Sequence, residues 1–144
     1  MRCFRSQVIL AAALVGCGSF STPSTQVQKP VHWLEQGIDH EGTRIDLGYR
    51  GERTSAEIEP VAVITRQGKP VSDAMVFVQL VSADGKETFG DEAATVYEPG
   101  VGKAPALYAP GPLKVSEGDA SRVVRFRVVL PEVDVDWTRD VKLP

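Results

Sequence analysis

The chain has 144 residues, with 16 Lys and Arg against 19 Asp and Glu, and its formal net charge is −3. This mild acidity gives no electrostatic reason to expect nucleic acid or anionic lipid as a partner. The only cysteines are Cys3 and Cys17. A zinc site built on several cysteines is therefore excluded, and we expect no internal disulfide.

Residues 1–16 have the features of a secretory leader. The chain opens with MRCFRSQ, which carries Arg2 and Arg5 and no acidic residue, and continues with the apolar run VILAAALV. A positive segment followed by a short apolar core is typical of a signal peptide. The run is far shorter than the roughly 20 apolar residues of a membrane-spanning helix. We expect this leader to be removed, which moves the formal charge from −3 to −5, and we expect no transmembrane helix.

The end of this leader, Leu14-Val15-Gly16-Cys17, resembles the lipobox of bacterial lipoproteins. The resemblance implies that the Cys17 sulfur receives a diacylglyceryl group and that Cys17 becomes the first mature residue, acylated on its amine. The implied partner is membrane lipid and the implied location is the bacterial cell envelope. Because Gly18 follows instead of Asp, the resemblance favours the outer membrane if the envelope is Gram-negative. The alternative is an ordinary signal peptide with a chance cysteine, although such peptides prefer a small-x-small cleavage site.

Residues 17–30 are predicted to form the lipidated cysteine and a flexible tether. The stretch GSFSTPSTQVQKP is rich in Ser, Thr, Gln and Pro, so it buries too little apolar surface to order itself. At about 5–6 Å per square root of the residue number, its mean reach is roughly 20 Å, enough to lift a domain just clear of the headgroups. The remaining residues, 31–144, have the size of one ordinary domain.

Alternation of apolar and polar side chains dominates this domain and predicts strands. RIDLGYR (44–50) and SRVVRFRVVL (121–130) alternate cleanly, as strands with one buried face do. EPVAVIT (59–65) and AMVFVQLV (74–81) are more continuously apolar, as expected for strands buried on both faces or near the sheet centre. VHWLEQG (31–37) is the only segment in which we expect a helical turn. The side chains that the two alternating segments should direct into the core are Ile45, Leu47, Tyr49, Val124, Phe126, Val128 and Leu130.

Turn residues separate these segments at short intervals. Asp84-Gly85 suits a two-residue type I′ hairpin, because both central positions of that turn need positive φ. It would pair residues 74–82 with residues 86–89. Further strands are expected in the segments 93–97, 104–108, 113–115, 133–137 and 141–143. About seven short strands with regular turns predict an all-β fold, a single antiparallel β-sandwich.

The middle of the chain, VITRQGKPVSDAMVFVQL, resembles bacterial immunoglobulin-like and transthyretin-like modules. In these modules a strand leads to Gly-x-Pro-Val, a two-residue turn and Ala-x-Val-x-Val. The matching positions are Val63, Gly68, Pro70, Val71, Ala74, Val76 and Val78. The chain departs from the carboxypeptidase-regulatory-like version, in which Thr-Asp-x-x-Gly-x-Tyr or Phe follows. The resemblance implies an immunoglobulin-like or transthyretin-like sandwich, and such modules are mostly non-catalytic.

No sequence pattern indicates catalysis. The only histidines, His32 and His40, lie close to the tether and are expected to be exposed polar residues. No Gly-x-Ser-x-Gly elbow occurs, and Gly100-Val101-Gly102 is not followed by the spacing that a phosphate-binding loop requires. We therefore expect a protein that is not an enzyme and needs no cofactor.

Glu132, Asp134 and Asp136 are the candidate metal ligands, because they alternate with apolar residues. On a strand their carboxylates would share one face, about 7 Å apart. A hard cation could bridge two of them if a loop supplied further oxygens. The competing interpretation is the solvated face of an edge strand, where like charges discourage pairing with another sheet.

Trp33 is the candidate partner-binding residue, because it precedes the first predicted strand and the other aromatic residues are expected in the core. The alternative is a packing lid over the end of the sandwich. The leading hypothesis is an envelope lipoprotein whose sandwich is a binding or structural module for an envelope protein, with an exposed sheet edge as the natural mode. A small-ligand or metal-ion carrier that uses the acidic strand around Asp134 is the alternative, and the sequence supports an enzyme least.

Overall fold

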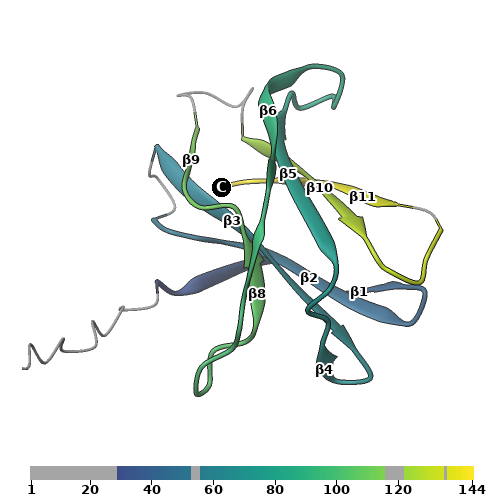
Figure 1. Ribbon diagram of the computed structural model, residues 1–144. Coiled ribbons are helices and arrows are strands. Elements are labelled where there is room, and N and C mark those ends of the chain that lie inside the picture. Colours follow the sequence, from purple (N-terminus) through teal and green to yellow (C-terminus); the bar gives the residue numbers. More distant parts are fainter. Residues whose placement is uncertain (1–28, 53–55, 116–121, 135) are drawn as a thin grey trace, which may run out of the picture.

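The computed structural model describes residues 29–52, 56–115, 122–134 and 136–144, which form two antiparallel sheets (Figure 1). The larger sheet contains β1 (Val31–His40), β2 (Thr43–Arg50), β3 (Glu57–Arg66), β4 (Lys69–Pro70), β7 (Val96–Glu98), β8 (Leu107–Ala109) and β9 (Leu113–Lys114). The smaller sheet contains β5 (Met75–Val81), β6 (Thr88–Ala94), β10 (Val123–Val129) and β11 (Trp137–Lys142). These residues contain no helix.

The strand order is β1-β2-β3-β8-β7 in the larger sheet, where β4 and β9 also pair with β3, and β11-β10-β5-β6 in the smaller sheet. Side chains from both sheets form one buried cluster between them. The predicted antiparallel β-sandwich is therefore confirmed. The described residues form eleven strands instead of about seven, because several short segments pair with only two or three residues each.

The core faces of β2 and β10 are those that the alternation predicts. Ile45, Leu47 and Tyr49 are at most 3% exposed, and the side chains of β10 and the residue after it are buried as well. The buried residues of this second group are Val124, Phe126, Val128 and Leu130. Both groups belong to the cluster between the sheets, whereas the charged residues of these strands, Arg44, Asp46, Arg50, Arg125 and Arg127, lie on the opposite faces.

The two continuously apolar segments lie near the centres of the sheets. β3 is buried on both faces, because Ala62 and Ile64 belong to the core cluster whereas Val61 and Val63 join a second cluster with two residues of β8. Since successive side chains of a strand point to opposite faces, this second cluster lies on the outer face of the larger sheet. β5 lies between β10 and β6; its residues Val76, Val78 and Val81 are buried, whereas Met75 is 55% exposed.

The expected helical turn at residues 31–37 is wrong. β1 pairs with β2 along its whole length, from Val31 opposite Arg50 to His40 opposite Thr43. The pairing has two irregularities, between Trp33 and Ile38. Each irregularity shifts the side chains that follow it to the other face of the sheet. The sequence of β1 therefore shows no regular alternation, although the strand forms.

The predicted pairing across the Asp84-Gly85 turn is confirmed, but the turn type is wrong. The Gly85 N–H donates to the Ser82 carbonyl at 2.8 Å, so Ala83 and Asp84 are the central residues. Within this turn only Gly85 has positive φ, at 71°. The Asp84 carboxylate accepts hydrogen bonds from the Ser82 hydroxyl and from the Lys86 N–H, which stabilises the observed conformation.

The chain crosses from the smaller to the larger sheet at Thr95, between β6 and β7. The Thr95 N–H and hydroxyl both donate to the Val76 carbonyl at 2.9 Å, which fixes the crossing against β5. As a result β6 and β7 follow each other along one side of the sandwich (Figure 1). On the opposite side the sheets meet through β1 and β11, where Arg139 pairs with Glu35 at 2.9 Å.

Candidate functional site

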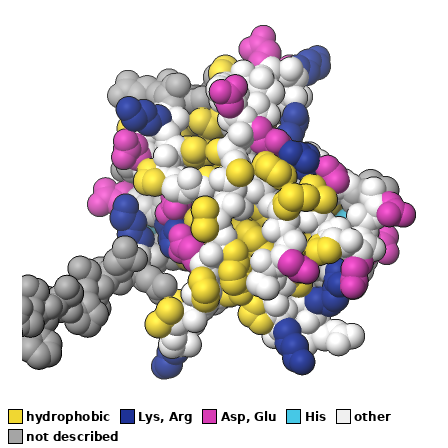
Figure 2. Space-filling view, in the orientation of Figure 1, with side chains coloured by type: hydrophobic (Ala, Val, Ile, Leu, Met, Phe, Trp, Pro, Cys, Tyr) yellow, Lys and Arg dark blue, Asp and Glu magenta, His cyan; other side chains and the backbone are white. Residues whose placement is uncertain are grey.

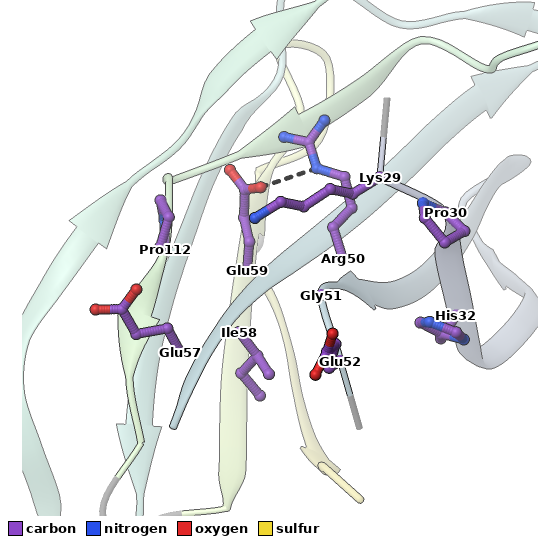
Figure 3. A pocket seen from close by; sticks show the side chains of 10 residues that line it. All are labelled: Lys29, Pro30, His32, Arg50, Gly51, Glu52, Glu57, Ile58, Glu59 and Pro112. Carbon is purple, nitrogen blue, oxygen red and sulfur yellow. Dashed lines mark hydrogen bonds and ion pairs between the residues drawn. The ribbon is translucent and has the colours of Figure 1, made fainter. Parts of the chain in front are cut away.

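A cavity of about 700 Å³ lies where the N-terminal end of the described chain meets the larger sheet (Figure 3). Its walls come from the start of β1, the end of β2 and the start of β3. Figure 3 shows the side chains of Lys29, Arg50 and Glu59 converging at its centre, with Pro112 on one side and His32 on the other.

A second cavity of about 290 Å³ shares Lys29, Pro30 and Arg50 with the first. Its other walls are the outer face of β1 and the base of the hairpin that joins β7 to β8. The residues that it adds include Trp33, Glu98, Pro99, Pro105 and Leu107. We call the two cavities together the N-terminal groove. Trp33 and Arg50 lie on the outer face of the larger sheet, whereas His32 is opposite the core-facing Tyr49 and Ile58 belongs to the core cluster, so the groove extends around the end of this sheet.

Arg50 is the central charged group of the N-terminal groove. Its Nε donates to Glu59 at 2.9 Å, and its two terminal nitrogens donate to the two oxygens of Glu98 at 2.8 and 2.9 Å. The bond to Glu98 is the main cause that raises the pKa of Arg50 above its ordinary value; burial opposes it and the bond to Glu59 adds to it. The guanidinium therefore keeps its positive charge, which the two glutamates balance, and it does not act as a proton donor.

Trp33 lies on the outer face of the larger sheet. It is paired with Gly48, which lies between the core-facing residues Leu47 and Tyr49 and so faces outward. A Cβ added to Gly48 would lie 3.1 Å from the Trp33 ring and 2.5 Å from the His32 carbonyl oxygen, so glycine is required there. Trp33 is 36% exposed and belongs to neither apolar cluster of the described residues. Its position fits a surface residue of the groove better than a lid over the core.

The acidic candidates do not share a strand face. β11 begins only at Trp137, and Glu132 lies in a turn that the Val133 N–H closes by donating to the Leu130 carbonyl. Pro131 follows β10 directly and has no N–H for a sheet, which ends the strand here. The expected strand over 133–137 is therefore wrong at residues 133, 134 and 136, whereas Trp137 is the first residue of β11; residue 135 lies outside the described residues.

Two of these carboxylates are bound by arginine. Glu132 accepts a hydrogen bond from Arg66 at 2.8 Å, and Asp136 accepts one from Arg127 at 3.0 Å. Asp134 lies in the loop between them. Among the residues that the structure describes, no group of three or more His, Cys, Asp or Glu side chains is arranged to hold a metal ion.

The histidines differ from each other in exposure. His32 is exposed, as expected, and stacks on Tyr49 with a ring distance of 5.0 Å. His40 is half-buried, contrary to expectation, and its ring lies 6.4 Å from that of Trp137, where the two sheets meet. Its Nε2 is buried without a hydrogen-bond partner in the described structure. Among the described residues, no hydrogen bond joins either ring to a hydroxyl or a carboxylate.

On the outer face of the smaller sheet, Arg127 is surrounded by partners that the sequence alone did not indicate. Arg127 donates to Glu92 at 2.6 Å and to Asp136 at 3.0 Å, and its guanidinium lies 4.1 Å from the centre of the Phe77 ring. The alternation in β10 predicts that Arg127 faces outward. The alternation does not predict that Glu92 of β6 and Asp136 before β11 are its partners, because only the strand order brings these residues together.

Cys17 lies outside the described residues, as do the rest of the predicted leader and nearly all of the predicted tether. The described part of the chain contains no helix of sufficient length and apolarity to cross a membrane. No protein-family model, curated protein or solved structure matches the chain.

Proposed function

We propose that this protein is a bacterial envelope lipoprotein, held to a membrane through acylated Cys17, whose β-sandwich is a non-catalytic binding or structural module. The observation that carries the proposal is the order of three features along the chain. A positive and apolar leader ends in Leu14-Val15-Gly16-Cys17, a polar segment follows, and the ordered sandwich begins at about Val31. An anchor, a spacer and a domain in this order suit a protein that works close to a membrane.

The chemistry of the N-terminal groove supports binding over catalysis. Its arginine is neutralised by two glutamates, and the histidine on its wall is stacked on a tyrosine. Trp33 and the nearby prolines add apolar surface that water covers in the isolated domain. A fixed ion pair beside an exposed aromatic ring is suited to contact with an envelope protein.

The alternative function, a small-ligand or metal-ion carrier around Asp134, has less support. Its premise was a strand face with three carboxylates, and two of the three are instead paired with Arg66 and Arg127. We therefore retain the binding or structural module as the proposed function.

Intact-mass analysis of the protein from the native membrane fraction tests the anchor. We expect a chain that begins at Cys17 and carries the added mass of a diacylglyceryl group and an amide-linked acyl chain. An unmodified start, or a full-length product in the cytosol, would contradict the proposal.

Chemical cross-linking in intact envelopes tests the binding role. Wild-type protein should give a cross-linked protein product that Trp33→Ala weakens. Met75→Ala is the matched control, because Met75 is 55% exposed on the smaller sheet and should leave the product unchanged. Equal yields from all three proteins would contradict a partner site at Trp33.

A further inference from the structure

The hairpin that joins β7 to β8 has an apolar and basic tip. Val101 is 70% exposed, and Lys103 is exposed two residues later. The loop between β7 and β8, residues 99–106, contains Lys103 and no acidic residue, although the whole chain has a net charge of −3. The tip therefore presents an apolar and a basic side chain with no acidic residue in the same loop.

The backbone holds this tip in one conformation. The Ala104 N–H donates to the Val101 carbonyl at 3.0 Å, and Gly102 between them has a φ of 62°. Gly100 packs so closely that an added Cβ would lie 2.7 Å from the Ala104 carbonyl oxygen. Because the turn is closed on itself, Val101 has little freedom to fold back, and its apolar surface is presented outward.

The tip projects beside the point where the N-terminal segment joins the domain. Lys29, the first described residue, lines the same cavity as Pro99, Ala104 and Pro105 at the base of the hairpin. Figure 1 shows the hairpin extending beyond the sheets on the side where β1 begins. In Figure 2 the projecting end shows hydrophobic and basic side chains and no acidic ones at its tip. The segment that leads to Cys17 therefore starts next to this hairpin.

We propose that the β7–β8 tip contacts the bilayer that holds Cys17, with Val101 entering the interfacial region and Lys103 among the phosphates. This inference rests on the proposed lipid anchor. The eleven residues 18–28 separate Cys17 from Lys29 and extend to at most about 40 Å. The anchor therefore keeps the tip within reach of the bilayer, and contact of the tip with lipid fixes the orientation of the sandwich relative to the membrane.

One valine buries too little apolar surface to hold a domain on a membrane from solution. The anchor removes that requirement, because it turns the contact into an intramolecular event with a high effective concentration. The lysine adds attraction to phosphate, and the loop that carries it, residues 99–106, contains no carboxylate. The contact should therefore form in the lipidated protein and be absent without the lipid.

A fluorescent label at the tip tests this contact in the lipidated mature protein. Val101→Cys provides a free thiol, since Cys17 is acylated and Cys3 leaves with the leader. The labelled protein is reconstituted into phosphatidylcholine and phosphatidylglycerol vesicles whose acyl chains are brominated. We expect the label to shift to the blue and to lose emission through quenching. Ala83→Cys is the matched control, because it is exposed in the turn before β6, at the other end of the β6–β7 side, and should show neither change.

Each other outcome overturns the inference in a recognisable way. Protein that floats with the vesicles while the label at position 101 stays unquenched retains the anchor and refutes the contact. Equal quenching at both positions indicates adsorption without orientation. Shielding of the label at position 101 only after envelope proteins are added indicates a protein partner. Failure to float at all removes the anchor, and with it both proposals.

Discussion

Arg50 and Glu98 lie 48 positions apart in the sequence and form a two-fold hydrogen-bonded ion pair, at 2.8 and 2.9 Å. The Arg50 side chain is only 12% exposed, whereas that of Glu98 is 41% exposed. With the further bond to Glu59, this pair links β2 and β3 to β7 and fixes the base of the hairpin that forms one wall of the N-terminal groove.

Replacing Arg50 with alanine should destabilise the domain by about 1–3 kcal/mol, because it leaves two partly buried glutamates without their cation. The figure is modest because Glu98 is partly solvated. Urea denaturation measures the change. Arg44→Ala is the matched control on the same strand, and since its side chain is 57% exposed it should cost less than about 0.5 kcal/mol. Similar losses for both variants would show that the Arg50 pair has no special role.

Phe126→Ala should reduce the free energy of unfolding by about 3–5 kcal/mol, because it leaves a cavity between the sheets. Phe126 is 0% exposed and is the largest fully buried side chain of the described residues. Phe89→Ala removes the same atoms from a side chain that is 36% exposed, so its effect should be clearly smaller. A loss below about 1 kcal/mol for Phe126→Ala would mean that the side chain does not fill the core.

Acid should weaken the fold partly through Glu92. The hydrogen bond from Arg127 holds the pKa of this carboxyl below its usual value, although burial acts in the opposite direction. The folded state therefore gains stability from Glu92 above the unfolded pKa of about 4.3, and loses it as the pH falls through the lower folded value. Glu92→Gln should be less stable than wild type at pH 7, and the difference should shrink below pH 4. A difference that is the same at both pH values would contradict this origin.

Cys17→Ser should release the protein from the membrane fraction, or leave the leader uncleaved, without unfolding the sandwich. The residue lies well before β1 and has no predicted role in the core. Cell fractionation and intact mass detect the first effect, and circular dichroism checks the second. Normal mature size with membrane attachment would refute the lipid anchor.

Calcium should leave the melting temperature of the domain unchanged. A cation at Glu132 or Asp136 would have to displace Arg66 or Arg127, each within 3.0 Å of its carboxylate. Differential scanning calorimetry with and without calcium measures this. A rise in melting temperature that Asp134→Asn abolishes would restore the carrier hypothesis.

The acidic segment and β1 show where sequence patterns were insufficient. Alternation around Asp134 predicted a strand, but Pro131 and a closed turn intervene before β11. In β1 a strand forms where none was predicted, because its irregular pairing with β2 removes the period-two alternation from its sequence. Local alternation indicates which residues prefer burial. It does not indicate whether a neighbouring strand is present to form hydrogen bonds with the backbone.

The all-β class, the inward faces of β2 and β10, and the motif on which the proposed anchor rests could all be predicted from the amino-acid sequence. These depend on side-chain periodicity and on short contiguous motifs, both of which are local properties. The ion pair between Arg50 and Glu98, and the position of Lys29 beside the β7–β8 hairpin, could be found only from the folded chain. Those contacts depend on strand order, which is set by the packing of the whole chain and by the closure of loops between distant segments.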